Sequence, residues 1–256
     1  MNLVNWIAFR TIVYKEVRRF MRIWQQTLLP PAITMVLYFI IFGNLIGSRI
    51  GDMGGFDYMQ FIVPGLIMMS VITNSYGNVS SSFFSNKFQR SVEEMMVAPV
   101  SNFTILSGFV VGGVVRGLLV GAMVTLLSLY FTSLHIHNLF VIISMITMTA
   151  VVFSLGGFIN AIYATKFDDV TIVPTFILTP LTYLGGVFYS ISLLPEFWQN
   201  VSLLNPVLYM VNAFRYGVLG VSDINIWAAF GMLFIFTAML LIWSMNLLHR
   251  GVGLRS

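Results

Sequence analysis

The longest stretch of the chain without a charged side chain covers residues 117–165 and reads GLLVGAMVTLLSLYFTSLHIHNLFVIISMITMTAVVFSLGGFINAIYAT. A helix needs about 20 apolar residues to cross a bilayer, so this stretch is too long for one crossing and long enough for two. The polar sequence His135-Ile-His137-Asn138 divides it. We therefore expect two membrane-spanning helices, at about residues 103–131 and 139–164, with boundaries good to a few residues.

Shorter uncharged gaps on either side contain the other candidate spans. We expect these at residues 27–46, 60–82, 170–190 and 226–248. Of the 256 residues, 58% are hydrophobic and 9% are charged, whereas a soluble domain carries about 25% charged residues. The composition therefore excludes a soluble enzyme. It predicts an all-α integral membrane protein with six transmembrane helices.

The basic residues are divided unequally between the two sides of the membrane that six spans define. Both chain ends lie on one side with ten of the 13 Lys and Arg residues, while Arg49 and Arg215 lie opposite and Arg116 lies within a span. Because cytoplasmic loops carry the excess of Lys and Arg, we expect both termini in the cytoplasm. The net charge of +4 thus reflects orientation and not nucleic-acid binding. The ten residues are Arg10, Lys15, Arg18, Arg19, Arg22, Lys87, Arg90, Lys166, Arg250 and Arg255.

Residues 1–24 precede the first span and are expected to form an amphipathic helix. At roughly 100° per residue, one arc of about 80° collects apolar side chains, and the opposite face is basic. The apolar set is Trp6, Phe9, Val13, Val17, Phe20 and Trp24, and the basic set is Lys15, Arg18, Arg19 and Arg22. Such a helix lies in the headgroup layer. A simple orientation signal is the alternative, whereas a cleavable signal peptide would need a basic start and a cleavage site.

Residue patterns for catalysis, or for driving transport, are missing from the sequence. It has no G-x-x-x-x-G-K-[ST] motif for ATP phosphates and no cysteine. Its nine acidic residues lie outside the middle of the predicted spans, whereas proton-coupled transporters usually relay protons through carboxylates within the membrane. His135 and His137 lack a third metal ligand and are better explained as a polar turn. We expect no metal or cofactor on this chain, and an energy source in another chain.

Several motifs occur in a recognisable order along the chain. Residues 61–66 read FIVPGL, 90–100 read RSVEEMMVAPV and 178–189 read LTPLTYLGGVFY; Leu194-Pro195, Asn205-Pro206, Tyr209 and Arg215-Tyr-Gly217 follow. This order resembles the ABC-2 type transporter permeases, and within that family the YadH-type inner-membrane permeases. The likeness covers essentially residues 1–256 as one transmembrane domain. It implies a protein of the bacterial inner membrane.

The resemblance also implies an assembly that works by alternating access, usually for export. Two copies of the permease would form a homodimer, and two copies of a separate ABC ATPase would bind ATP and Mg. In such permeases a short coupling helix between spans two and three contacts the ATPase. Carried over, that helix would use Lys87, Arg90, Glu93, Glu94, Met95 and Met96.

The residues of this loop support the same interpretation independently. Residues 86–100 combine charges of both signs with an apolar patch, which is the combination that a docking surface needs. A solvated loop is the alternative. Lys166, Asp168 and Asp169 form a shorter loop on the same side. For these three residues a second contact with the ATPase and a plain solvated loop are equally open.

Residues 191–222 are apolar and contain two prolines, Pro195 and Pro206, which argue against a seventh straight span. Two re-entrant half-helices fit better, and the resembled family has such an element on the external side. We expect this hairpin to close the external end of the pathway, before span six at 223–248 and a cytoplasmic tail at 249–256. Glu196 and Arg215 either pair to hold the hairpin or lie separately at headgroup level.

Polar residues recur at helical spacing in two of the predicted spans. Span two carries Ser70, Asn74, Asn78 and Ser82, and span five carries Thr171, Thr175, Thr179 and Thr182. Such stripes within lipid either join helices or line a polar route. The resembled family places these two spans beside the central pathway, so we assign the two stripes to a translocation path.

Span three contains a glycine repeat and the one charge within a span. Gly113, Gly117 and Gly121 recur every four residues, which allows close helix packing within one subunit or, alternatively, between two copies. Arg116 costs on the order of 3 kcal/mol at mid-membrane. It should therefore snorkel, pair with backbone carbonyls, or face the path and bind an anionic group.

Taken together, the sequence predicts the permease subunit of an ATP-binding cassette exporter, without catalytic residues of its own. An amphiphilic, lipid-linked or drug-like substrate fits, because no large external domain is present to capture a polymer. A stand-alone secondary transporter or channel is the alternative. A lipid-modifying enzyme would need a convergent nucleophile, base or metal set, which is missing.

Overall fold

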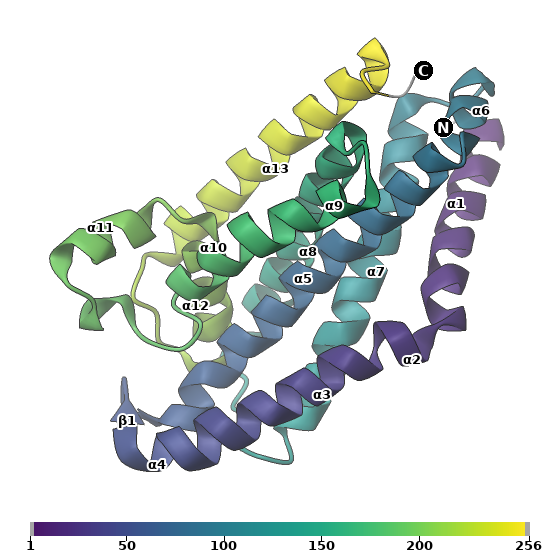
Figure 1. Cartoon of the computed structure of the whole chain (residues 1–256). Coiled ribbons are helices and arrows are strands. Elements are labelled where there is room, and N and C mark those ends of the chain that lie inside the picture. Colours follow the sequence, from purple (N-terminus) through teal and green to yellow (C-terminus); the bar gives the residue numbers. More distant parts are fainter. Residues whose placement is uncertain (1–2, 254–256) are drawn as a thin grey trace.

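The structure, a computed structural model, describes residues 3–253, apart from the side chains of Asn44 and Ser48, and consists mainly of helices (Figure 1). Its first part comprises α1 (Leu3–Arg22), α2 (Trp24–Thr27), α3 (Leu29–Tyr38), η1 (Phe39–Ile46), α4 (Gly47–Ile50), β1 (Asp52–Met53) and β2 (Phe56–Asp57). The middle part comprises α5 (Tyr58–Phe88), α6 (Ser91–Val97), α7 (Asn102–Ser128) and α8 (Leu139–Tyr163). The last part comprises α9 (Phe167–Val173), η2 (Pro174–Leu178), α10 (Thr179–Leu184), η3 (Ile191–Leu193), α11 (Glu196–Leu203), α12 (Pro206–Leu219) and α13 (Ile226–Arg250).

Five of these helical stretches are long and apolar enough to cross a membrane: Trp24–Gly43, α5, α7, α8 and α13. They match predicted spans one, two, three, four and six. The predicted fifth span corresponds to α9, η2 and α10, which follow one another without a gap. The α-helix of α9 gives way to a π-helix, η2, at Pro174. A proline has no amide hydrogen to donate, which explains the change. The all-α class is confirmed, and the six-span count stays a prediction.

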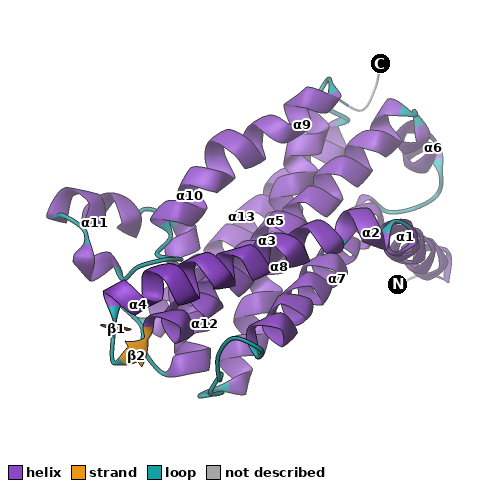
Figure 2. Cartoon of the chain, turned by 60° about the horizontal axis from the view of Figure 1, so that its bottom comes forward, coloured by secondary structure: helices purple, strands orange, loops and turns teal. Residues whose placement is uncertain are grey.

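Each end of the helix bundle collects segments that are far apart in the sequence. At one end, which we call the α6 end, Asn5 accepts a hydrogen bond from the amide of Ser101, and Asn102 lies 3.4 Å from His249. Both ends of the described chain therefore lie together. At the opposite end, which we call the α11 end, lie α4, the β1–β2 hairpin, α11 and α12 (Figures 1 and 2).

The centre of the bundle is α5, which packs against α7, α8 and α12. Two hydrophobic clusters fill the interior, and Leu66 and Phe83 of α5 are fully buried members of the two. Small residues allow the helices to approach closely. A Cβ added at Gly157 of α8 would lie 2.4 Å from the carbonyl oxygen of Tyr76 on α5. The main chains of α5 and α8 are therefore in direct contact.

The glycine repeat of span three packs within this one chain. Added Cβ atoms at Gly113 and Gly117 would meet Val79 and Ser75 of α5, and one at Gly121 would meet Val71. The proposed role of these glycines in a contact between two copies is thus not what the structure shows. The adjacent face of α7 packs against α1, where Gly108 lies against Ile12 and Gly112 lies against Glu16.

Candidate functional site

A helix of seven residues, α6, lies where the sequence predicts the coupling helix (Figure 2). Arg90 precedes it with φ +61°, a left-handed conformation that turns the chain sharply after α5. Val92 is buried in the cluster with Phe84 and Leu106 and so fixes α6 on the bundle. Glu94 is exposed, Met95 and Met96 are half-buried, and Val97 is 88% exposed. The helix is therefore held in place while presenting an acidic and apolar outer edge.

Lys87 has a structural task that the sequence did not indicate. Its Nζ donates to the carbonyl oxygens of Ile162 and Ala164, at 2.5 and 2.8 Å. These carbonyls lie at the carboxyl end of α8, where helix carbonyls have no intrahelical partner and a cation is favoured. Lys87 thus connects the end of α5 to the end of α8.

The second predicted contact loop begins α9. Lys166 and Asp168 are exposed, and the Asp169 carboxylate accepts hydrogen bonds from Thr165 N, Thr165 Oγ1 and Lys166 N at 2.8, 2.8 and 3.0 Å. The bonds from Thr165, aided by that from Lys166, lower the pKa of Asp169 from its ordinary value. Asp169 therefore caps the first turn of α9 and holds residues 165 and 166 against it.

The polar stripe of α5 is buried beneath α1 and α7. Ser82 donates to Glu16 of α1 at 2.6 Å, and Arg19 binds both Glu16 at 3.3 Å and Asn78 at 2.9 Å. Glu16 is fully buried. The stripe is thus a joint between helices in this chain, formed around an ion pair on α1 that the amphipathic pattern did not reveal.

Arg116 of α7 extends the same network. Its Nη2 donates to Asn74 Oδ1 at 3.2 Å, while its Nε has no partner among the described residues. The arginine is half-buried and is paired with a side-chain amide. Part of the hydrogen-bonding capacity of Arg116 is therefore satisfied by Asn74 of the α5 stripe. Of the predicted alternatives, pairing with backbone carbonyls is the nearest, although the acceptor is a side-chain carbonyl.

The threonine stripe of span five lies elsewhere. Thr171, Thr175 and Thr179 are exposed on α9, η2 and α10, and Thr182 is buried. The structure therefore does not bring the two predicted stripes together within one chain. The face of α5 that stays exposed instead carries Thr73, Gly77 and Ser81. These residues also recur every four positions, each one residue before a member of the predicted stripe. A repeat of small residues in the sequence could have identified them.

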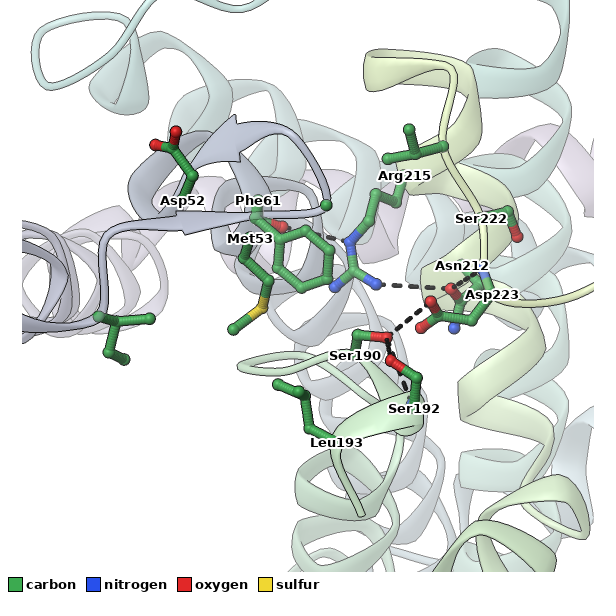
Figure 3. Close-up of a pocket in the computed structure, with 13 residues that line it drawn as sticks. Asp52, Met53, Phe61, Ser190, Ser192, Leu193, Asn212, Arg215, Ser222 and Asp223 are labelled. Carbon is green, nitrogen blue, oxygen red and sulfur yellow. Dashed lines mark hydrogen bonds between the residues drawn. The ribbon is translucent and has the colours of Figure 1, made fainter.

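The α11 end contains a hollow of about 500 Å³ around Arg215 of α12 (Figure 3). Arg215 is 1% exposed. Its guanidinium donates to Gly186 O at 2.6 Å, Phe61 O at 3.2 Å and Asn212 Oδ1 at 3.5 Å, and lies 3.9 Å from the centre of the Phe61 ring. One side chain thus connects α5, α12 and the turn after α10.

Asp223 completes this end of the molecule. Its carboxylate accepts hydrogen bonds from Ser190 Oγ at 2.7 Å and Ile191 N at 3.2 Å, and its amide donates to Asn212 Oδ1 at 3.1 Å (Figure 3). The connections before η3 and after α12 are therefore held by one carboxylate. We call the set Arg215, Asn212, Asp223 and Ser190 the arginine clamp.

The other predicted gate residues have local tasks. Glu196 is exposed on α11 and does not pair with Arg215, whose partners are carbonyl and amide oxygens. The reason is depth, because α12 buries Arg215 in the bundle while α11 stays at its surface. Pro195 precedes α11 and Pro206 is the first residue of α12. Proline is favoured at a helix start, so both prolines begin helices.

The basic face of α1 forms a second hollow, of about 770 Å³, against the end of α5. The apolar arc of α1 is only partly exposed: Phe20 is buried and Trp6 and Trp24 are about half exposed. The predicted amphipathic helix exists, and part of its apolar face packs on α7. Arg255, one of the ten basic residues predicted on the cytoplasmic side, lies outside the described residues.

Comparison with known proteins identifies relatives over nearly the whole chain. The model of the family described as ABC-2 type transporter matches residues 7–219. The inner membrane transport permease YadH of Escherichia coli (strain K12) is 59% identical over 251 residues, which are 98% of each chain. Nodulation protein J of Rhizobium leguminosarum bv. viciae is 23% identical over 216 residues, 84% of this chain and 83% of the relative. The apolar helices are those of a membrane protein, and these matches show the family: the chain is a membrane transport permease that belongs to the ABC-2 type transporter family.

Proposed function

We propose that this chain is the membrane-spanning subunit of an ATP-driven exporter. Two copies form the pathway, and two copies of a separate ABC ATPase, which bind ATP and Mg, dock at the α6 end. The observation that carries the proposal is the placement of α6. This helix is fixed by the buried Val92, and it presents Glu94 and the 88% exposed Val97 at the end where both chain ends gather.

The placement of the chain in the membrane follows from the same proposal. Residues 170–184, which cover most of α9 and all of η2 and α10, form the fifth of six crossings, and the α6 end lies in the cytoplasm. Support comes from the positive charges of this end, because Lys and Arg accumulate on the cytoplasmic side. The α11 end with the arginine clamp then closes the external side.

The pathway itself lies on surfaces that one chain leaves open. α5 is largely buried, yet its exposed face carries Thr73, Gly77 and Ser81. Thr171, Thr175 and Thr179 are exposed near the apolar Phe176 and Ile177. A second copy that covers these faces would enclose a route with hydroxyls and apolar side chains. Such a lining suits an amphiphilic, lipid-linked or drug-like substrate.

A substitution at the outer edge of α6 tests this proposal. We expect Val97→Asp to weaken co-purification with the cognate ATPase by roughly tenfold, the effect of losing one apolar anchor at an interface. Stimulation of ATP hydrolysis in vesicles should fall in parallel. Leu204→Asp is the matched control, because Leu204 is 83% exposed at the α11 end. Normal ATPase binding by the Val97 variant, or equal loss in both variants, would contradict the proposal.

A further inference from the structure

The hollow between α1 and the end of α5 is lined by cations on one side and neutral hydrogen-bond donors on the other. Its residues from α1 include Lys15, Arg18, Arg19 and Arg22, and those from α5 include Ser82, Ser85, Asn86 and Gln89. With a volume of about 770 Å³, it is open to one side and large enough for a lipid headgroup. Guanidinium and ammonium groups facing hydroxyls and amides form the kind of surface that binds a phosphate.

Of the four cations that line this hollow, only Arg19 is paired with a carboxylate among the described residues. Among the described residues that line it, none is Asp or Glu. Glu16, the acid on the same helix, is fully buried and occupied by Ser82 and Arg19. Lys15 is held by Asn86 Oδ1 at 2.6 Å, whereas Arg18 and Arg22 have no acceptor within the described chain. Two guanidinium groups are therefore available to an anion.

Exposed apolar side chains lie next to Arg22 in the chain. On the same turns as Arg22, the side chains of Met21, Ile23 and Trp24 are 44%, 37% and 51% exposed. A free anion would gain nothing from these side chains, but the glycerol and acyl part of a lipid would bury them. The combination of free guanidinium groups with an apolar margin thus favours a lipid over a free anion.

We propose that this hollow binds the phosphate-bearing headgroup of an anionic lipid from the leaflet at the α6 end. Arg18 and Arg22 contact the phosphate, Lys15 and the neutral donors at the end of α5 close the site, and the acyl chains pass the exposed Met21 and Ile23, which flank Arg22 in the chain. Glu16 already joins α1 to α7 and to α5. A lipid bound in the hollow would add a second link between α1 and α5, through Arg18 and Arg22.

The test measures lipid bound to the purified full chain, by native mass spectrometry after exchange into mixed vesicles of phosphatidylcholine and phosphatidylglycerol. In Arg18→Gln/Arg22→Gln, retention of phosphatidylglycerol should fall roughly thirtyfold, from the loss of two cations near the membrane surface. Arg10→Gln/Arg250→Gln is the matched control, because it removes two exposed cations of the same end outside the hollow. This control should retain much more lipid than the test variant.

Further arms separate the lipid from other anions and from a folding defect. Inorganic phosphate and glycerol 3-phosphate, added as competitors, should displace little phosphatidylglycerol. Arg18→Lys/Arg22→Lys should restore part of the binding, and thermal unfolding in phosphatidylcholine alone should match wild type for all variants. Unchanged lipid retention in the Gln variant, equal loss in the control, or full competition by inorganic phosphate would overturn the proposal.

Discussion

At the scale of single residues, Arg215 is the side chain on which the α11 end depends. It serves two main-chain carbonyls, Phe61 O and Gly186 O, from a position that is 1% exposed. The arginine reaches the two carbonyls with separate nitrogens, Nε and Nη2, whereas the donors of a lysine are all on one nitrogen, so we expect Arg215→Lys to leave one buried acceptor unpaired. We expect the variant to lose about 1–3 kcal/mol of stability, measured by thermal unfolding of the purified protein.

Arg49→Lys provides the comparison for this prediction. Arg49 lies on α4 at the same end of the molecule and is exposed, so the same change of side chain should leave the unfolding temperature unchanged. If both variants unfold like wild type, the arginine clamp does not hold the α11 end together.

The buried charges show what single residues of a sequence conceal. The sequence left open whether Arg116 snorkels, pairs with carbonyls or faces the path, and in the structure it donates to the side-chain amide of Asn74. It did not predict that Glu16 is fully buried, because Glu16 is flanked by basic residues on a helix whose pattern is typical of a membrane surface. Its burial depends on Ser82, 66 residues further along the chain. Such long-range pairing cannot be inferred from helical periodicity.

At the scale of elements, the start of α9 depends on a carboxylate that must be ionised. Hydrogen bonds from Thr165 and Lys166 lower the pKa of Asp169. A lowered pKa means that the stabilisation is present above the ordinary carboxyl pKa and is lost as pH falls through the lowered value. We therefore expect the amides of residues 165 and 166 to be protected from hydrogen exchange at neutral pH and to lose that protection in acid.

Substitutions separate this turn from general effects of acid. Asp169→Asn should lower the protection of both amides at neutral pH and remove its dependence on pH. In Asp168→Asn, whose side chain is exposed and does not cap the helix, protection should be unchanged. Fast exchange of these amides in wild type at neutral pH would show that the turn is not formed.

Long apolar helices were predicted well from their length and lack of charge, whereas the subdivision of the proline-containing segment was not predicted. α7, α8 and α13 begin and end close to the predicted spans 103–131, 139–164 and 226–248, and α5 begins close to residue 60 and continues to Phe88. The segment Phe167–Leu184 combines Pro174 and Pro180 with polar threonines, so hydropathy alone could not show how it is divided. The threonine stripe was found by spacing, but spacing does not tell which face of a helix a neighbour covers.

At the scale of the whole molecule, close contact between α5 and α8 holds the bundle together. The sequence showed glycines at helical spacing but not which neighbour each one would meet. Two adjacent glycines of α8 differ sharply in this respect. An added Cβ at Gly157 would lie 2.4 Å from Tyr76 O, a main-chain atom, whereas one at Gly156 would lie 3.7 Å from the Tyr76 ring.

Alanine at these two positions therefore measures the helix contact directly. Gly157→Ala must push α8 away from α5, and overpacking of this kind costs about 1–3 kcal/mol. Gly156→Ala meets only ordinary contact distances and should be neutral or gain up to about 1 kcal/mol from better helix propensity. Chemical or thermal unfolding in detergent compares the two. Because both variants change the same atom count in the same helix, equal stability would mean that α5 and α8 do not pack main chain to main chain.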